Sequence, residues 1–72
     1  MLNAGSAWVV AKEWLKNRGY GDMYADSLKF VQKEESLWHI TAKFTYMLTE
    51  DKQADIWIDD ETREVVRYKV EP

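Results

Sequence analysis

His39 is the one histidine of the chain and the first residue whose type could serve acid–base chemistry. Such catalysis needs a nucleophile or a second titratable group within hydrogen-bond reach. On the outer face of a predicted strand its neighbours are Thr41 and either Lys33 or Leu37, and none of these is the serine or cysteine partner of a catalytic pair. We therefore expect a solvated histidine, no catalytic residue and a chain that is not an enzyme.

Three consecutive acidic residues, Asp59, Asp60 and Glu61, are the candidates for binding a divalent cation. A calcium loop spaces its ligands at alternate residues and uses a glycine at its sharp turn, and this stretch has neither feature. Gly19 and Gly21 flank a predicted helix end, whereas a phosphate-binding loop leads into a helix start. The sequence therefore predicts a solvated acidic turn, no metal site and no cofactor.

Size and charge exclude further classes of protein. The chain has 72 residues, which predicts a single domain over 1–72, and it has no cysteine to supplement a small core. Its 13 acidic and 10 basic residues give a net charge of -3, the wrong sign for gripping a phosphate backbone, so we expect no nucleic-acid partner. No apolar run approaches the roughly 20 residues of a membrane helix, and the N-terminus lacks the order of a signal peptide. We expect no membrane partner and a cytoplasmic location.

The elements that must position any site begin with a helix predicted over residues 4–18. Its apolar residues recur at helical spacing, and these are Ala4, Ala7, Trp8, Ala11, Trp14 and Leu15. Asn3 or Ser6 can cap its start, and Gly19 can end it in a left-handed conformation. Val9 is the exception, because it falls on the polar side.

After the helix the apolar period changes from 3.6 to 2, which predicts strands over residues 24–32, 37–49, 53–59 and 64–70. The second strand carries the clearest alternation, and its inward-facing residues are Trp38, Ile40, Ala42, Phe44, Tyr46 and Leu48. The connections are short and polar, so neighbouring strands should pair antiparallel. Parity of the apolar residues favours three-residue loops at Glu50–Lys52 and Glu61–Arg63. The predicted cross-strand pairs are Tyr46–Ile56, Ile56–Tyr68, Thr45–Trp57, Trp57–Arg67, Asp55–Lys69, Lys43–Asp59 and Ile58–Val66.

The predicted fold class is α+β, with one N-terminal helix packed on one face of a four-stranded antiparallel meander sheet. Trp14, Phe44 and Ile56 are expected to be buried together where the helix meets the sheet. The second face of the sheet stays uncovered in this arrangement.

The last hairpin, "ADIWIDDETREVVRY", resembles that of the cystatin-like small domains and in particular the PepSY type, in which an alternating strand leads into Ile-Asp, two variable residues and Thr-Gly-Glu-Val. The matching residues are Ile58, Asp59, Thr62, Glu64 and Val65, while Arg63 stands where that pattern has Gly. The resemblance implies a non-catalytic module that binds or restrains a partner such as a peptidase. Because a three-residue loop of this kind commonly ends at positive φ, we expect Arg63 to adopt it.

Trp57 is the residue that points to a function, because it lies on the uncovered face of the predicted sheet. We expect it to share that face with Met47, Val65 and Arg67, with Met23 and Val31 as further candidates, and an apolar centre with a charged rim is typical of a contact surface. This predicts a protein-interaction or self-association module, with a homodimer as one form. Two alternatives stay open: Trp57 is only a surface cation–π partner of Arg67, or the chain is a small-ligand or enzyme accessory domain. The ligand pocket would then lie between helix and sheet, lined by Trp8, Trp14, Trp38 and Tyr46.

Overall fold

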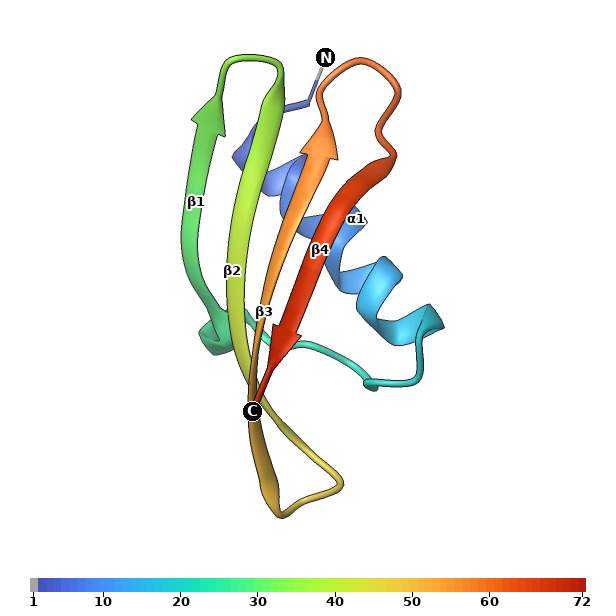
Figure 1. The fold of residues 1–72 in the computed structure, drawn as a ribbon, viewed down its shortest axis with the longest axis vertical. Coiled ribbons are helices and arrows are strands. Elements are labelled where there is room, and N and C mark those ends of the chain that lie inside the picture. The colour runs from blue at the N-terminus through green and yellow to red at the C-terminus, as the bar shows by residue number, and fades with distance from the viewer. Residues whose placement is uncertain (1) are drawn as a thin grey trace.

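The computed structural model describes residues 2–72 as one helix packed behind one antiparallel sheet (Figure 1). Helix α1 spans Ala4–Asn17, and a short 3-10 turn, η1, spans Ala25–Ser27. The strands are β1 (Leu28–Glu34), β2 (Leu37–Tyr46), β3 (Glu50–Asp59) and β4 (Val65–Glu71), and they lie side by side in chain order. The predicted α+β architecture, a helix on one face of an open four-stranded meander, is confirmed.

Helix α1 begins and ends at residues that satisfy its free backbone groups. Asn3 Oδ1 accepts a hydrogen bond from the Ser6 N–H at 2.8 Å, which is the N-cap interaction. At the other end Gly19 has φ +91°, and the Tyr20 N–H reaches back to the Leu15 carbonyl at 3.1 Å. This left-handed closing turn ends the helix where a side chain with Cβ would be strained. No helix among residues 2–72 combines the length and the apolar character needed to cross a membrane.

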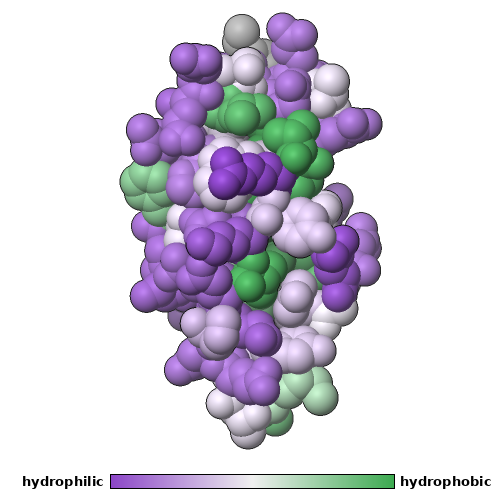
Figure 2. Space-filling view, viewed as in Figure 1, coloured by the Kyte–Doolittle hydropathy of each residue, from purple (hydrophilic) through white to green (hydrophobic). Residues whose placement is uncertain are grey.

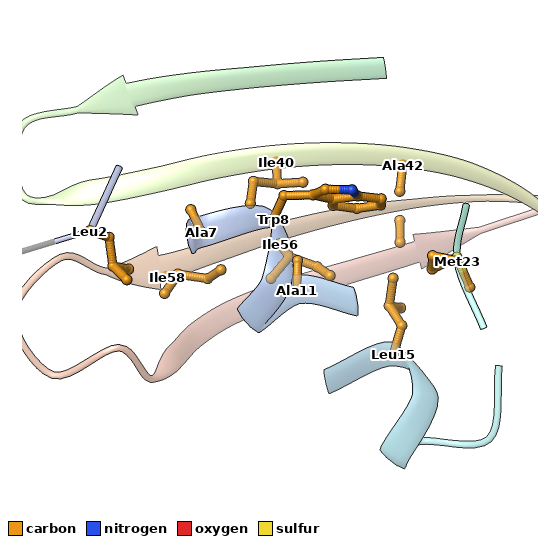
Figure 3. Packing of buried hydrophobic residues seen from close by; sticks show 11 residues of the cluster. Leu2, Ala7, Trp8, Ala11, Leu15, Met23, Ile40, Ala42, Ile56 and Ile58 are labelled. Atoms are coloured by element: carbon orange, nitrogen blue, oxygen red, sulfur yellow. The ribbon is translucent and has the colours of Figure 1, made fainter. Parts of the chain in front are cut away.

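The core is centred on β2 and β3, directly under the small residues of α1. Leu15, Ile40, Ile56 and Ile58 are fully buried, and Trp8 closes over them (Figure 3). The other members of the core are Leu2, Ala7, Ala11, Met23, Ala42 and Ala54. Since alanines line the helix at this contact, the helix can lie close to the sheet, and the larger aromatic rings are left to fill the margins.

The expectation that Trp14 and Phe44 lie at the centre of the core with Ile56 is therefore wrong. Both aromatic residues are only partly buried and pack against the margin of the core. Trp14 contacts Tyr68, with ring centroids 4.8 Å apart, and Phe44 contacts Tyr20 edge-on at 5.5 Å.

The β2–β3 hairpin turns earlier than the alternation predicts. The predicted strand 37–49 ends at Tyr46, which pairs with Glu50, so the turn is Met47–Thr49 and not Glu50–Lys52. The observed partner of Tyr46 thus lies six residues before the predicted Ile56, and the predicted Thr45–Trp57 and Lys43–Asp59 pairs are wrong as well. The polar residues of the predicted loop instead form the start of β3, in a hairpin that projects beyond the ends of β1 and β4 (Figure 1).

Two bulges change which side chains face the helix. One lies between Leu28 and Phe30 in β1, a strand that begins four residues later than the predicted start at residue 24. The other lies in β4, where Ile58 pairs with Val65 and not with the predicted Val66. An extra residue in one strand reverses the faces of the residues beyond it. The predicted pairs of Ile56, Trp57 and Asp55 with β4 lie outside this bulge and are confirmed.

Arg63 has φ +63°, so the predicted left-handed conformation in the β3–β4 turn is confirmed. Its N–H bonds the Asp59 carbonyl at 2.9 Å and holds the turn closed. Because a Cβ is strained there by about 1–2 kcal/mol, Arg63→Gly is expected to leave stability unchanged or raise it by up to about 1 kcal/mol after the extra backbone entropy of glycine is counted.

Chemical denaturation of Arg63→Gly beside Glu61→Gly tests this expectation. Glu61 lies in the same turn without a positive φ, so its replacement should lower the denaturation midpoint. Equal losses in the two variants would show that Arg63 is not strained.

Candidate functional site

The candidate site is the outer face of the sheet, which is the face opposite α1. Four side chains, one from each strand, form a continuous row across it: Phe30, His39, Trp57 and Arg67, called here the outer row. The antiparallel register puts His39 directly opposite Trp57 and Trp57 directly opposite Arg67. Figure 2, in which this face is toward the viewer, shows mainly hydrophilic side chains with small, separate hydrophobic areas.

Trp57 is held between two flanking groups of the outer row. The His39 ring stacks on the indole at a centroid distance of 4.4 Å with an interplanar angle of 7°, and the Arg67 guanidinium lies 4.8 Å from the indole centroid. The two groups come from the strands on either side of β3, so both faces of the indole are covered. Its edge is left to face outward, and a planar ligand cannot stack on Trp57 without displacing a neighbour.

Phe30 extends the outer row to the β1 edge. Its ring meets His39 edge-on at 5.6 Å, and it is 44% exposed. Phe30 faces outward because the bulge in β1 reverses the alternation, and the same reversal turns Val31 toward Ile40 on the helix side. Val31, a further candidate for the outer face, therefore belongs to the helix side of the sheet.

Asp55 fixes the orientation of His39. One of its oxygens, Oδ1, accepts from the Thr41 hydroxyl at 2.6 Å and from His39 Nε2 at 3.0 Å. Burial, the largest single influence, raises the pKa of the Asp55 carboxyl, but the hydrogen bonds from Thr41, His39 and Gln53 together outweigh it and lower this pKa. Asp55 is thus an ionised acceptor at neutral pH, and His39 Nε2 carries the hydrogen.

The arrangement has limited means for catalysis. The Thr41 hydroxyl donates to Asp55 and not to His39, so the three groups do not form a relay ending at a nucleophile. Across residues 2–72 no cluster of three or more histidine or acidic side chains is suited to holding a metal ion. What the outer row offers is a rigid, partly exposed aromatic surface.

Only two of the four residues predicted for the interaction surface lie together. Trp57 and Arg67 are in contact, and the cation–π alternative is thus part of the site. Met47 lies in the turn at the tip of the β2–β3 hairpin, and Val65 is turned to the helix side by the β4 bulge. Met23, the other further candidate, is buried in the core. The prediction that Val65 and Met23 share a face with Trp57 is wrong, and Met47 lies outside the paired strands.

Sequence reasoning missed Phe30 and His39 as members of the site and predicted Asp55 only as part of its charged rim. His39 was expected to be a solvated histidine beside Thr41, yet its side chain is 19% exposed and lies in a stack. The alternation does place His39 and Asp55 on the outer face. Whether His39 contacts Asp55 and Trp57 on β3 depends on the register between β2 and β3. A bulge of a single residue leaves no trace in composition.

The acidic turn has a structural role that its sequence does not suggest. Asp60 Oδ1 accepts from Trp38 Nε1 at 2.8 Å and from the Leu2 N–H at 3.0 Å, and Oδ2 lies 3.4 Å from Lys33 Nζ. The Asp60 N–H also donates to the Ser36 carbonyl. The side chain is 7% exposed, so the prediction of a solvated turn is wrong at this residue. Asp60 ties the N-terminal segment, β1, β2 and the β1–β2 turn together.

Asp59, by contrast, stabilises its own turn. Its Oδ1 accepts from the N–H groups of Glu61 at 2.8 Å and Thr62 at 3.0 Å. The backbone hydrogen bonds from Thr62 and then Glu61 lower the pKa of the Asp59 carboxyl. Local turn geometry thus accounts for this residue without a ligand.

The alternative function places a ligand pocket between helix and sheet, where the tryptophans of its lining pack with the core. Trp8 is buried, and Trp14 and Trp38 pack against the core. A hollow of about 710 Å³ lies elsewhere, between the segment after α1 and the β2–β3 hairpin, where its wall includes Tyr20 and Phe44. Its charged lining residues are Asp22, Asp26, Lys29, Lys43, Asp51 and Lys52, so both signs of charge are present.

Comparison of the chain with protein-family models, with curated proteins and with solved structures finds no match. The resemblance of the last hairpin to the PepSY type therefore stays a prediction, and function has to be argued from the geometry.

Proposed function

We propose that the chain is a non-enzymatic protein-interaction module that binds through the outer row, with a second copy of the same chain as the favoured partner and another protein as the alternative. The observation that carries the proposal is Trp57, fixed edge-on between His39 and Arg67 on a face that α1 does not cover. Tryptophan and arginine are the residues most enriched among those that dominate binding energy at protein interfaces. A pre-ordered side chain also loses little entropy on binding.

The charges around the outer row suit self-association. Asp55 lies opposite Lys69 across β3 and β4, so both signs of charge occur beside Trp57. A surface that carries both signs can be complementary to itself across a two-fold axis. Two such sheets would stack about 10 Å apart, the usual spacing of packed sheets.

Covering both faces of the indole favours a protein contact over a small planar ligand. A sugar or nucleobase binds tryptophan through an open ring face, and the outer row leaves only the edge of Trp57 accessible. The rival function, a small-ligand or accessory domain with a pocket between helix and sheet, gains no support from the packed tryptophans there.

Sedimentation equilibrium over micromolar to millimolar concentrations tests the proposal. The wild type is expected to form a concentration-dependent dimer, and Trp57→Glu is expected to weaken it at least tenfold, since the interface centre loses its anchor and gains an unpaired charge. Val9→Glu is the matched control, because Val9 is an exposed apolar residue on the helix and 48% of its surface is accessible.

The circular dichroism spectrum of each variant establishes that it is folded. Equal dimerisation by wild type and Trp57→Glu would contradict the role of the outer row. A wild type that stays monomeric at millimolar concentration would contradict self-association.

A further inference from the structure

β1 stops short of the end of its neighbour β2. The pair of these strands nearest the hairpin tip is Leu28–Ala42, whereas β2 continues to Tyr46, and the β2–β3 hairpin projects beyond β1 (Figure 1). Alternate backbone N–H and C=O groups of residues 43–46 therefore point to a side on which no strand lies. This free stretch of β2 is a template for a short length of another extended chain.

The hollow of about 710 Å³ lies along this free stretch of β2. Its wall includes Lys43, Phe44 and Thr45, and its volume is that of an ordinary ligand pocket. Tyr24 and Leu48 also line it, and they are 71% and 94% exposed. Large side chains with so little cover favour contact with apolar groups of a partner, so the hollow suits a chain that carries apolar side chains.

Two exposed lysines without an ionic partner line the hollow where it meets β1. Lys29 lies at the β1 bulge, and Lys43 is the first residue of β2 beyond the end of β1. Neither forms an ion pair within residues 2–72. Asp26, in the turn η1 that leads into β1, also lines the hollow. Together the three groups leave a surplus of one positive charge beside the start of β1.

The other charged residues of the hollow leave this surplus in place. Asp51 lies nearer the hairpin tip, where it accepts a hydrogen bond from the Thr45 hydroxyl at 3.2 Å. The remaining two belong to the ion pairs Lys16–Asp22 and Glu50–Lys52.

The direction of an added strand follows from these charges. β1 occupies the continuation of the free stretch, so an added strand has to end or leave the sheet beside Lys43. A strand antiparallel to β2 brings its carboxyl end to Lys29 and Lys43, whereas a parallel strand brings its amino end there. Because a carboxylate is attracted to the two lysines and an ammonium group is repelled, the antiparallel direction with a free carboxyl end is favoured.

The β3 side of the same hairpin is a poorer site. β4 leaves β3 unpaired before Gln53, at residues 50–52. Two of these residues, Glu50 and Asp51, are acidic and would repel a carboxylate. The β2 side alone combines a free strand edge with lysines that lack an ionic partner.

We propose that the free stretch of β2 binds the extended carboxyl-terminal tail of another protein. The tail pairs antiparallel with residues 43–46, and its terminal carboxylate lies beside Lys29 and Lys43. Apolar side chains at alternate positions of the tail lie on the helix side, beside Phe44 and Tyr46. Backbone hydrogen bonds supply affinity in this mode of recognition, and the alternating side chains and the captured carboxylate supply specificity. The proposal goes beyond docking on the outer row, because it uses a different surface and a different chemistry.

The probe is a short acetylated peptide of alternating valine and threonine, with valine next to last and a free carboxyl end. Its control is the same peptide with a terminal amide. In amide NMR spectra of the full chain, the carboxylate peptide is expected to shift the signals of residues 43–46 and to slow hydrogen exchange of alternate amides there several-fold. The amide peptide is expected to bind about two- to tenfold more weakly, because it lacks the charge that the two lysines attract. Added salt should reduce this difference.

Lys43→Gln tests the charge contact directly. It is expected to weaken binding of the carboxylate peptide about two- to fivefold and to leave binding of the amide peptide unchanged. Arg63→Gln is the matched control, because it removes the same charge from an exposed residue of the β3–β4 turn, at the other end of the sheet (Figure 1). This control should bind both peptides as the wild type does.

Trp57→Glu should also bind the carboxylate peptide, which separates this proposal from docking on the outer row. Four results would overturn the proposal. These are equal binding of the carboxylate and amide peptides, no shift at millimolar peptide, shifts that centre on β4 or on the outer row, and shifts of residues 43–46 on raising the protein concentration without peptide. The last result would make a second copy of the chain the occupant of the free stretch.

Discussion

Ile56→Ala is expected to lower the free energy of unfolding by about 2–5 kcal/mol, a large part of the stability of so small a domain. Ile56 is fully buried at the centre of the sheet, between Ile40 on β2 and Tyr68 on β4. Truncating it removes apolar contacts and leaves a cavity that the helix cannot close without shifting. Phe44→Ala should cost less, because Phe44 lies at the margin of the core.

Urea denaturation of the wild type, Ile56→Ala and Phe44→Ala measures the loss of unfolding free energy in each variant. Val9→Ala is the control at an exposed apolar site. Val9→Ala is expected to stay within about 0.5 kcal/mol of the wild type. A denaturation midpoint for Ile56→Ala equal to that of the control would mean that α1 does not cover the face on which Ile56 lies.

Asp60→Ala is expected to lower the melting temperature by on the order of 10 °C, the second large effect. The substitution leaves the Trp38 indole N–H and the Leu2 N–H without their acceptor and removes the partner of Lys33. Buried donors left unpaired lose the full benefit of solvation that they had in the unfolded chain. Glu61→Ala, at the exposed neighbour, should melt close to the wild type.

Acid should remove the stabilisation that Asp60 provides. The hydrogen bond from Trp38 is the main cause that lowers the pKa of the Asp60 carboxyl below its ordinary value of 3.8, and the Leu2 N–H and Lys33 act in the same direction against burial. A carboxyl whose folded-state pKa is lowered stabilises the fold above its ordinary pKa and loses this contribution as the pH falls through the folded-state value.

The wild type should therefore lose its stability advantage over Asp60→Asn as the pH is lowered from about 5 to below 3.8. Melting curves of both proteins over this pH range provide the comparison. Both proteins contain Asp55 and Asp59, so the effect of acid on these two residues cancels in the difference. A difference in melting temperature that does not change with pH would contradict the role of the ionised Asp60 carboxyl.

The helix and the order of strands could be predicted because both depend on short-range patterns. Helical spacing and the Asn3 and Gly19 caps defined α1, and alternation marked the strands. The same alternation misled at the β2–β3 turn, since Leu48 continues the apolar phase yet lies in the turn with 94% of its surface exposed. Moving the turn by three residues moved the register by six.

The site was harder to predict because it depends on how separate segments meet. A one-residue bulge in β1 turns Phe30 to the outer face, and a one-residue bulge in β4 turns Val65 to the helix side. No property of either residue indicates its bulge. The stack of His39 on Trp57 follows only from the true register. Asp60 accepts a hydrogen bond from the N–H of Leu2, which is 58 positions away in the chain. The predicted contact between Trp57 and Arg67 was correct because this residue pair lies in the part of the β3–β4 ladder that the β4 bulge does not shift.

The most direct test of the outer row as an interaction surface uses the indole N–H signals of the four tryptophans in an NMR dilution series. Trp8, Trp14 and Trp38 belong to the core or pack against it, and Trp57 lies on the outer face. If the outer row is the interface, the Trp57 indole signal shifts or broadens as the protein concentration rises from micromolar to millimolar, while the signals of the other three stay in place. Movement of the Trp14 or Trp38 signal with a constant Trp57 signal, or no movement of any of the four, would contradict that interface.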